Sequence, residues 1–486
     1  MSLSTFSPRM GTGKTCLAIA GLFLVLMTSS PAATAARTLP YTGLSSPSGP
    51  SSFLDSPTAY ENTPFTPNTE HAYGTWNGLR TRLAGMGIGL GLDYVGESAI
   101  ILDGGRTNVT GSAGYTHQVA VQLHLNWQKL VGWKGFNTHV VLVNRAGHNL
   151  STDAGDRSLV NVQEIYGGGG NVIAHLVSAY GTQDLLNQRM QIALGYMSVN
   201  LDFSTSPLYC TFMNNAICGN PKTQTKGSIG FSNTPNGALG GRLRFWPLHG
   251  LYVQGGAYGV NAGIGKPRYT RTGFEFATSA YTGVYVPFEI GAIPVYGPHA
   301  LIGHYKIAAA YDSSIYPSYY DDINGNPIPL TGLPARTARG KIQVWATMDQ
   351  MILRNGRGLY EGLYLMAGYV HNTPRASPYE HQYYVGLSDR GMIPGRPNDT
   401  FGLLVNRITA SSTLVAAQKL SYKRGKKLPA NALTPQSSAT VIEATYNIHV
   451  LQGLWVQPDA QYVINPNLEK RVKNLAVLGL RLRVIF

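Results

Sequence analysis

The chain has 486 residues, a length that suffices for about three globular domains or for one large barrel. Only 13% of its residues are charged, 57 are glycine and 29 are tyrosine, the formal net charge is +14 and the mean hydropathy is −0.07. This composition is too polar for a helical membrane protein and contains too few charged residues for a typical soluble one. It suits a barrel wall with one apolar and one polar face.

The first 35 residues have the layout of a secretory signal peptide. Arg9 and Lys14 precede the apolar run 16–27, and residues 33–35 form a small-residue cleavage site. We therefore predict that residues 1–35 are removed on export.

The rest of the chain is predicted to be a leader followed by one membrane domain. Residues 36–75 are rich in Ser and Pro and show little apolar periodicity, which is typical of an exposed leader. Residues 76–486 contain no uninterrupted apolar stretch of the eighteen or more residues that a spanning helix needs. We predict an outer-membrane barrel domain for this part.

A short helix and a series of alternating strands follow one another along this domain. Within 76–86, Leu79, Leu83 and Met86 recur at helical spacing. Residues 88–95 then alternate apolar residues with Gly, Asp93 and Val95, as expected of a strand. Similar alternation recurs, whereas residues 268–339 alternate poorly. The other alternating segments are 118–130, 136–145, 189–199, 239–246, 251–260, 442–450 and 454–462.

The last segment, 476–486, has the clearest alternation. Leu478, Leu480 and Leu482 point to one side, and Arg481 and Arg483 point to the other. This pattern favours a transmembrane strand with a lipid-facing side and a lumen-facing side. We therefore expect Leu480→Arg to impair folding and Arg481→Leu to change mainly the conductance.

Successive strands cross the membrane in opposite directions, so counting strands assigns each connection to one end of the barrel. If the last strand ends in the periplasm, the turns at 247–250 and 452–453 are periplasmic, and the long loops lie outside the cell. Cys210 and Cys218 then share an external loop, where a disulfide between them is expected to contribute about 2.5 kcal/mol by restricting the unfolded chain.

A second external loop carries the one basic cluster of the chain. Such a cluster is typical of a solvated loop that contacts lipid phosphates, so we predict outer-membrane lipid and lipopolysaccharide as partners and no nucleic acid. A monomer is favoured, although an oligomer is compatible with the sequence. The cluster consists of Lys419, Lys423, Arg424, Lys426 and Lys427.

The sequence contains no motif specific for an enzyme. It lacks a G-x-S-x-G elbow, an H-E-x-x-H helix and a paired Cys-x-x-Cys set, and most of its 12 histidines are isolated. We therefore predict no catalytic residue, no cofactor and no metal site.

Polar residues on the alternating strands are instead predicted to line a pore. Both signs of charge and several amides occur together, which suits a wall that hydrogen-bonds a neutral polyhydroxylated solute. The predicted pore-lining or substrate-contacting residues are Arg80, Asp93, Glu97, Arg242, Arg244, Glu443, Asn447, Gln457, Asp459, Gln461, Arg481 and Arg483.

Four strings of the barrel domain are specific: WNGLRTRLAGMGIGLGLDYVGES at 76–98, GMIPGRPNDTFGLLV at 391–405, YNIHVLQGLWVQPDAQYVINPN at 446–467 and LGLRLRVIF at 478–486. Together they resemble the carbohydrate-selective porin family of Gram-negative outer membranes. The resemblance implies about sixteen antiparallel strands, a short N-terminal helix, inward-folding extracellular loops and passive uptake of glucose or similar sugars. Residues that match the family's opening and later motifs are Trp76, Gly78, Leu79, Arg80, Leu83, Pro394, Gly395, Arg396, Pro397 and Asp399.

The leading hypothesis is therefore a channel for passive diffusion of small carbohydrates. One alternative is a general or anion-preferring porin, because arginines are abundant on the polar faces. The other is a carbohydrate-binding surface barrel whose mouth is plugged by its long loops.

Overall fold

The computed structural model describes residues 71–106, 109–156, 162–163, 171–264, 272–274, 276–356 and 360–486. The predicted signal peptide and most of the predicted leader lie outside the described residues. The chain divides into two compact units, and the larger one, Thr42–Val295 with Leu301–Phe486, contains the barrel. From the smaller unit the structure describes Tyr296–Ala300.

Sixteen long strands form a closed antiparallel barrel. Each pairs with the next in chain order, and β17 pairs back with β1, from Ile485 opposite Asp93 to Lys473 opposite Gly105. This confirms the predicted all-β barrel and the strand number that the family resemblance implies. The strands are β1 (Ile88–Gly105), β2 (Ala113–Asn126), β3 (Phe136–Gly147), β4 (Val172–Leu185), β5 (Met190–Met197), β6 (Ala238–Leu248), β7 (Leu251–Asn261), β8 (Tyr281–Ala292), β10 (Leu301–Asp322), β11 (Ala335–Arg354), β12 (Gly362–Asn372), β13 (Tyr379–Arg390), β14 (Thr400–Ala410), β15 (Ser438–Leu451), β16 (Leu454–Ile464) and β17 (Lys473–Ile485), with a two-residue strand β9 (Val295–Tyr296) beside β10.

The helices are short and lie in the connections. Within the described ranges, none is both long enough and apolar enough to cross a membrane. The helices are α3 (Leu79–Met86), α4 (Trp127–Val131), α5 (Leu150–Asp153), α6 (Lys222–Gly227), α8 (Ile328–Thr331) and α9 (Ser412–Lys423), and the 3-10 turns are η2 (Val199–Leu201), η3 (Tyr209–Thr211), η4 (Thr278–Ala280), η5 (Pro429–Asn431) and η6 (Pro466–Leu468).

The two faces of the strands differ in exposure, as alternation predicts. On β17, Leu478 and Leu480 are each 47% exposed, whereas Arg481 is 7% exposed. Outward apolar side chains from other strands continue this surface around the barrel, as a lipid-facing belt requires. Exposed members of the belt are Leu194, Leu243, Val286, Phe288, Ile290, Ile342, Val385, Val405, Leu478 and Leu480.

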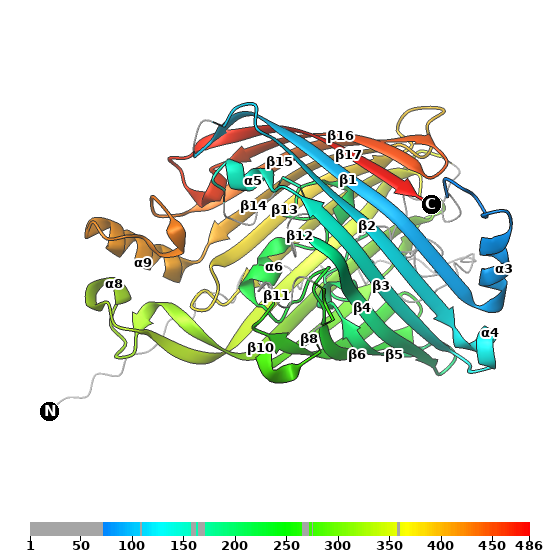
Figure 1. Cartoon of the computed structure of the whole chain (residues 1–486), viewed down its shortest axis with the longest axis horizontal. Coiled ribbons are helices and arrows are strands. Elements are labelled where there is room, and N and C mark those ends of the chain that lie inside the picture. The colour runs from blue at the N-terminus through cyan, green and yellow to red at the C-terminus, as the bar shows by residue number, and fades with distance from the viewer. Residues whose placement is uncertain are drawn as a thin grey trace. The chain divides into compact units, whose positions relative to one another are not determined.

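Short and long connections separate at opposite ends of the barrel. Helices α3 and α4 lie at the end that carries Phe486, and α8 and α9 lie at the other end (Figure 1). The connections 249–250 and 452–453 at the first end have two residues each, whereas 198–237 and 411–437 are long. This distribution matches the short periplasmic turns and long extracellular loops of bacterial barrels.

Two predicted element boundaries were wrong. The strand predicted to run to Leu130 ends at Asn126, because the Asn126 Oδ1 atom accepts a hydrogen bond from Lys129 N (3.0 Å) and starts α4. The helix predicted from Trp76 begins at Leu79, because the backbone at Trp76 has a positive φ of 51°.

Candidate functional site

Residues 198–237, between β5 and β6, form an inserted segment that contacts the inner wall of the barrel. Ser204 N donates to Glu289 Oε2 on β8 (2.9 Å), and Ser206 Oγ donates to Asp349 Oδ2 on β11 (2.8 Å). Only β10 separates these two strands, but further bonds reach strands from β6 to β17 around the barrel, so the segment lies inside the wall. Other wall residues that bond to it are Arg244, Gln254, Lys306, Asp312, Gln343, Asn372, Gln382, Tyr384, Glu443, Gln457, Gln461 and Arg481.

Aromatic side chains of the inserted segment pack against the same wall. Phe231 lies edge-on to Trp345 (centroids 6.0 Å apart) and to Tyr285 (6.1 Å), and Phe203 lies edge-on to Tyr258 (6.2 Å). All five side chains are at most 2% exposed. Each such pair contributes about 0.5–1.5 kcal/mol beyond its burial, so apolar packing and hydrogen bonds fix the segment together.

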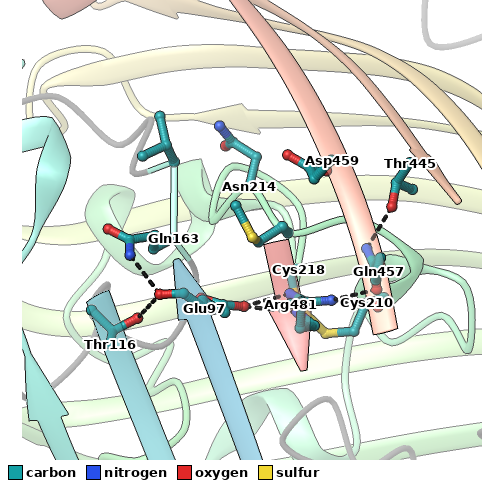
Figure 2. A network of polar contacts seen from close by, with 12 residues as sticks. Glu97, Thr116, Gln163, Cys210, Asn214, Cys218, Thr445, Gln457, Asp459 and Arg481 are labelled. Carbon is teal, nitrogen blue, oxygen red and sulfur yellow. Dashed lines mark hydrogen bonds and ion pairs between the residues drawn. A yellow bond between two sulfur atoms is a disulfide. The ribbon is translucent and has the colours of Figure 1, made fainter. Parts of the chain in front are cut away.

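Arg481 and Glu97 hold the part of the inserted segment that contains its disulfide. Cys210 and Cys218 are joined by a disulfide with Cα atoms 4.4 Å apart. Arg481 Nη1 donates to Cys210 O (3.1 Å), and Arg481 Nε donates to Glu97 Oε1 (2.8 Å) (Figure 2). Gln457 Nε2 donates to the next carbonyl, Thr211 O, at 2.9 Å. Three predicted wall residues therefore converge on this turn.

Replacing both cysteines by serine is expected to leave the barrel assembled and to loosen this turn. Arg481 and Gln457 bond to the carbonyls of Cys210 and Thr211, and only the 3.9 Å contact of Arg481 Nη2 with Cys218 Sγ involves the disulfide. The loss should therefore be about 2.5 kcal/mol, the value for a loop of this length. Heat-modifiable migration on gels should be retained, and single-channel recordings should show more frequent current fluctuations. Collapse of the whole barrel on reduction would contradict the assignment of the disulfide to this loop alone.

Glu443 binds the segment after the first cysteine. Its Oε1 atom accepts hydrogen bonds from Met213 N and from Asn214 N (3.0 Å). Asn214 Nδ2 donates to Gln461 Oε1 (2.7 Å), and Gln461 Nε2 donates to Asp459 Oδ1 (2.7 Å). Glu443, Asp459 and Gln461, all predicted from the sequence, thus form one hydrogen-bonded group on β15 and β16.

Asp202 of the inserted segment pairs with two arginines of β6. Arg244 Nη2 lies 2.9 Å and Arg242 Nη2 lies 3.1 Å from Asp202 Oδ1. Gln254 Nε2 on β7 donates to Asp202 O at 2.8 Å. The three charged side chains are at most 2% exposed, so this ion pair is buried.

Two glycines on the wall make room for the segment. A Cβ atom on Gly479 of β17 would lie 2.4 Å from Met213 Cε, and one on Gly402 of β14 would lie 2.9 Å from Thr211 Cγ2 and 3.0 Å from Phe212 Cε1. Side chains at these positions would force Met213, Thr211 or Phe212 of the segment to shift, which is consistent with glycine within otherwise regular strands.

The structure places the remaining predicted wall residues elsewhere. Asp93 accepts a hydrogen bond from Gln122 Nε2 (3.2 Å), and Arg483 lies over the Trp455 ring (5.9 Å to its centroid). Asn447 lies on β15 opposite Thr400. These residues belong to the wall but are not among those that bond to the inserted segment.

Arg80 has a different place, at the end of the barrel that carries Phe486. Arg80 Nη2 donates to Phe486 O (2.6 Å), Arg80 Nη1 donates to Leu90 O (3.0 Å), and the guanidinium lies 4.3 Å from the Trp76 ring centroid. The Tyr73 ring stacks on the Phe486 ring, with centroids 5.7 Å apart. Arg80 therefore joins α3 to the seam between β1 and β17, and a contact with solute stays a prediction.

Sequence reasoning missed several wall residues that hold the inserted segment. Glu289 was identifiable, because it stands between Phe288 and Ile290 in an alternating run. Lys306 and Asp349 gave a weaker signal, because Ala308 and Met351 stand beside them on the inner face and break the polar pattern. Asp202 was not identifiable, because it belongs to the inserted segment and not to a strand.

The later family motif, at 394–399, lies at the barrel end that carries Phe486. Its Asp399 and the groups that hydrogen-bond to this carboxylate are called the clamp here. Asp399 Oδ2 accepts from Arg396 Nε (2.7 Å) and from Tyr446 Oη (2.9 Å), and Asp399 Oδ1 accepts from His449 N (2.9 Å). Burial raises the pKa of Asp399, but these hydrogen bonds outweigh it and hold the pKa below its usual value. The turn between β13 and β14 is thereby fixed to β15.

This clamp is expected to lose its contribution in acid. A carboxyl with a lowered folded-state pKa stabilises the fold above its unfolded pKa of about 3.9, and the stabilisation is lost as the pH falls through the folded-state pKa. Asp399→Asn should therefore reduce the free energy of unfolding at pH 7 and flatten its decline in acid. Urea unfolding in lipid vesicles at several pH values measures this. The matched variant Asp153→Asn, in an exposed pair with His148, should keep the wild-type acid profile.

A closed antiparallel barrel with an apolar outer belt, a polar inner wall and an inserted segment defines a porin, a diffusion channel of the outer membrane. The chain belongs to the carbohydrate-selective porin, OprB family, whose profile matches residues 110–486. It is therefore an outer-membrane channel for carbohydrates.

Relatives and solved structures agree with this assignment. Porin B of Pseudomonas aeruginosa is 29% identical over 429 residues, which cover 87% of this chain and 92% of that protein. The high-pH structure of Pseudomonas putida OprB matches with a TM-score of 0.78 at 28% identity and covers 86% of this chain and 99% of that chain. The low-pH structure of that protein matches with a TM-score of 0.52 at 18% identity, over 86% and 98% of the two chains, and shares the fold.

Proposed function

We propose that small neutral carbohydrates such as glucose diffuse passively along the inner wall and hydrogen-bond to the guanidinium groups of Arg242 and Arg483. The observation that carries this proposal is the set of donors these residues leave on the wall. Arg242 Nε and Nη1, and Arg483 Nε and Nη2, have no hydrogen-bond partner among the described residues. They are covered by neighbouring side chains, so these must shift before a sugar hydroxyl reaches the donors. Sugar hydroxyls are acceptors for such groups and require no compensating charge.

Paired charges on the wall support a neutral solute. Arg481 lies 2.7 Å from Glu97, and Asp202 faces Arg242 and Arg244. Opposite charges held this close reduce the field that an ion would experience. The predicted residues Glu443, Asn447, Gln457, Asp459 and Gln461 supply further hydrogen-bonding groups to this wall.

Liposome swelling with a size series of sugars tests the proposal. Glucose and similar monosaccharides are expected to enter quickly, larger oligosaccharides slowly, and a charged sugar acid of similar size more slowly than glucose. Arg242→Gln and Arg483→Gln should each slow glucose entry while the barrel keeps its heat-modifiable migration. Equal rates for all sugars would contradict selective passage.

A general or anion-preferring porin is the second candidate, and the abundance of inward arginines favours it. Reversal potentials in a salt gradient separate the two, because a basic constriction favours chloride and a mixed one does not. The third reading, a loop-plugged carbohydrate-binding barrel, predicts no single-channel current in refolded protein. The many hydrogen bonds between the inserted segment and the wall are the observation that favours this plugged barrel.

The proposal also covers the export, the oligomeric state and the lipid contacts of the protein. Residues 1–35 act as a cleaved signal peptide and residues 36–75 as an exposed leader, so N-terminal sequencing of the mature protein should begin near residue 36. The barrel works as a monomer, without a catalytic residue or cofactor. The basic residues of the cluster at 419–427 are all exposed and contact lipopolysaccharide phosphates.

A further inference from the structure

Three metal-ligating side chains meet on the outer surface of β12 and β13, away from the inner wall. His371 stands directly opposite His381 across this strand pair, and Glu380 precedes His381 at an irregularity in the pairing of β13 with β14. The neighbouring Val370 and Gln382 are fully buried, so the two histidines point outward. They lie near the ends of both strands that face the same side as the long connections.

The distances within this group suit a single ion. One nitrogen from each ring and one carboxylate oxygen of Glu380 all lie within 4.8 Å of one another. His381 Nε2 lies 3.3 Å from Glu380 Oε1, and the two Nδ1 atoms of His371 and His381 lie 3.3 Å apart. These two distances involve different nitrogens of His381, and only one of them can bind the ion. Ligands that bind zinc at about 2.0–2.1 Å in a tetrahedron are about 3.4 Å apart, so side-chain rotations that close the 4.8 Å limit to this spacing complete the site.

Neighbouring groups hold two of the three side chains in place. Glu380 Oε2 accepts a hydrogen bond from Ser412 N at the start of α9 (2.8 Å), which leaves Oε1 directed at His381. The Tyr369 hydroxyl lies 2.9 Å from His381 Nδ1 and can accept its proton when Nε2 binds a metal. Such partners of a ligand fix its tautomer and orientation.

We propose that His371, Glu380 and His381 form a binding site for a divalent transition-metal ion, of which zinc is the probe of choice. Two imidazoles and one carboxylate are a ligand set that zinc accepts, with a further position left for water. The ion would join β12, β13 and, through Glu380, the loop that carries α9. The sequence did not predict this site, because the ligands are brought together by strand pairing and not by a short motif.

Zinc binding to the full-length protein in detergent micelles tests the proposal. Wild-type protein is expected to bind one more equivalent of zinc than His371→Ala or His381→Ala, and its melting temperature should rise with zinc. Glu380→Gln should weaken zinc binding by at least about tenfold, the lower limit seen when even a partner of a ligand is removed. X-ray absorption should show two imidazole nitrogens and carboxylate oxygen around the zinc.

His117→Ala is the matched control, because His117 also lies on the barrel surface but stacks on Tyr94 and packs against the tilted ring of Tyr115. Its zinc stoichiometry should equal that of wild type. All variants should keep heat-modifiable migration and glucose uptake, which excludes misfolding as the cause of a loss. Equal zinc uptake by wild type and both histidine variants, or no zinc uptake by wild type, would overturn the proposal, and an unchanged affinity in Glu380→Gln would remove the carboxylate from it.

Discussion

Leu480→Arg is expected to reduce the free energy of unfolding by about 2–4 kcal/mol in lipid vesicles. Leu480 lies near the middle of β17 and is 47% exposed on the outer surface, so the guanidinium would be placed among lipid chains. Urea unfolding followed by tryptophan fluorescence measures the loss.

Asn447→Arg is the matched control for this variant. It introduces the same side chain on the inner face of β15, where water and polar groups accept it. Its stability should remain close to that of wild type. A loss as large as that of Leu480→Arg would mean that inner and outer faces had been assigned incorrectly.

Asp202→Ala is expected to cost about 3–5 kcal/mol, since it removes the shared carboxylate of a buried ion pair. Arg242 and Arg244, 2% and 0% exposed, would lose their ionic partner while they remain within the wall. The first part of the inserted segment should separate from β6, so single-channel conductance should rise and become noisier. Urea unfolding and planar-bilayer recording measure the two effects.

Asp153→Ala provides the comparison for a surface pair. Asp153 lies 2.8 Å from His148, but the two side chains are 28% and 57% exposed. Its loss should therefore cost no more than about 1 kcal/mol and leave the conductance unchanged. Similar losses in the two aspartate variants would show that burial of the Asp202 pair does not determine its contribution.

The outer face of the barrel was predictable because contact with lipid imposes a two-residue rhythm on the sequence. The last strand and the pairs 239–246 with 251–260 and 442–450 with 454–462 show this rhythm, and all of them are strands in the structure. Sequence reasoning did not identify β8 and β10, which lie within 268–339. On β10, inward Ala308 and Ala310 pack in one cluster with Phe203 and Phe231 of the inserted segment, whereas inward Lys306 and Asp312 bond to it, so the inner face mixes apolar and polar residues and the alternation is weak.

The contribution of Arg481 to stability could not be predicted from the sequence either. Alternation identified it correctly as an inward residue and led to the expectation that Arg481→Leu changes mainly conductance. The structure pairs Arg481 with Glu97, which is fully buried, and with Cys210 O. Arg481→Leu would leave the Glu97 carboxylate without this partner, so a loss of stability is expected as well.

The hydrogen bonds that hold the inserted segment are distributed around the barrel, so the width of the passage is fixed. Ser204, Ser206, Asn214 and Ser228 bond to β8, β11, β16 and β10 respectively, so no hinge at one side can swing the segment out of the way. Flux should then follow the concentration gradient without a gating step. Solute preference can accordingly be redesigned by exchanging wall side chains one at a time, because each exchange disturbs one attachment and leaves the others in place.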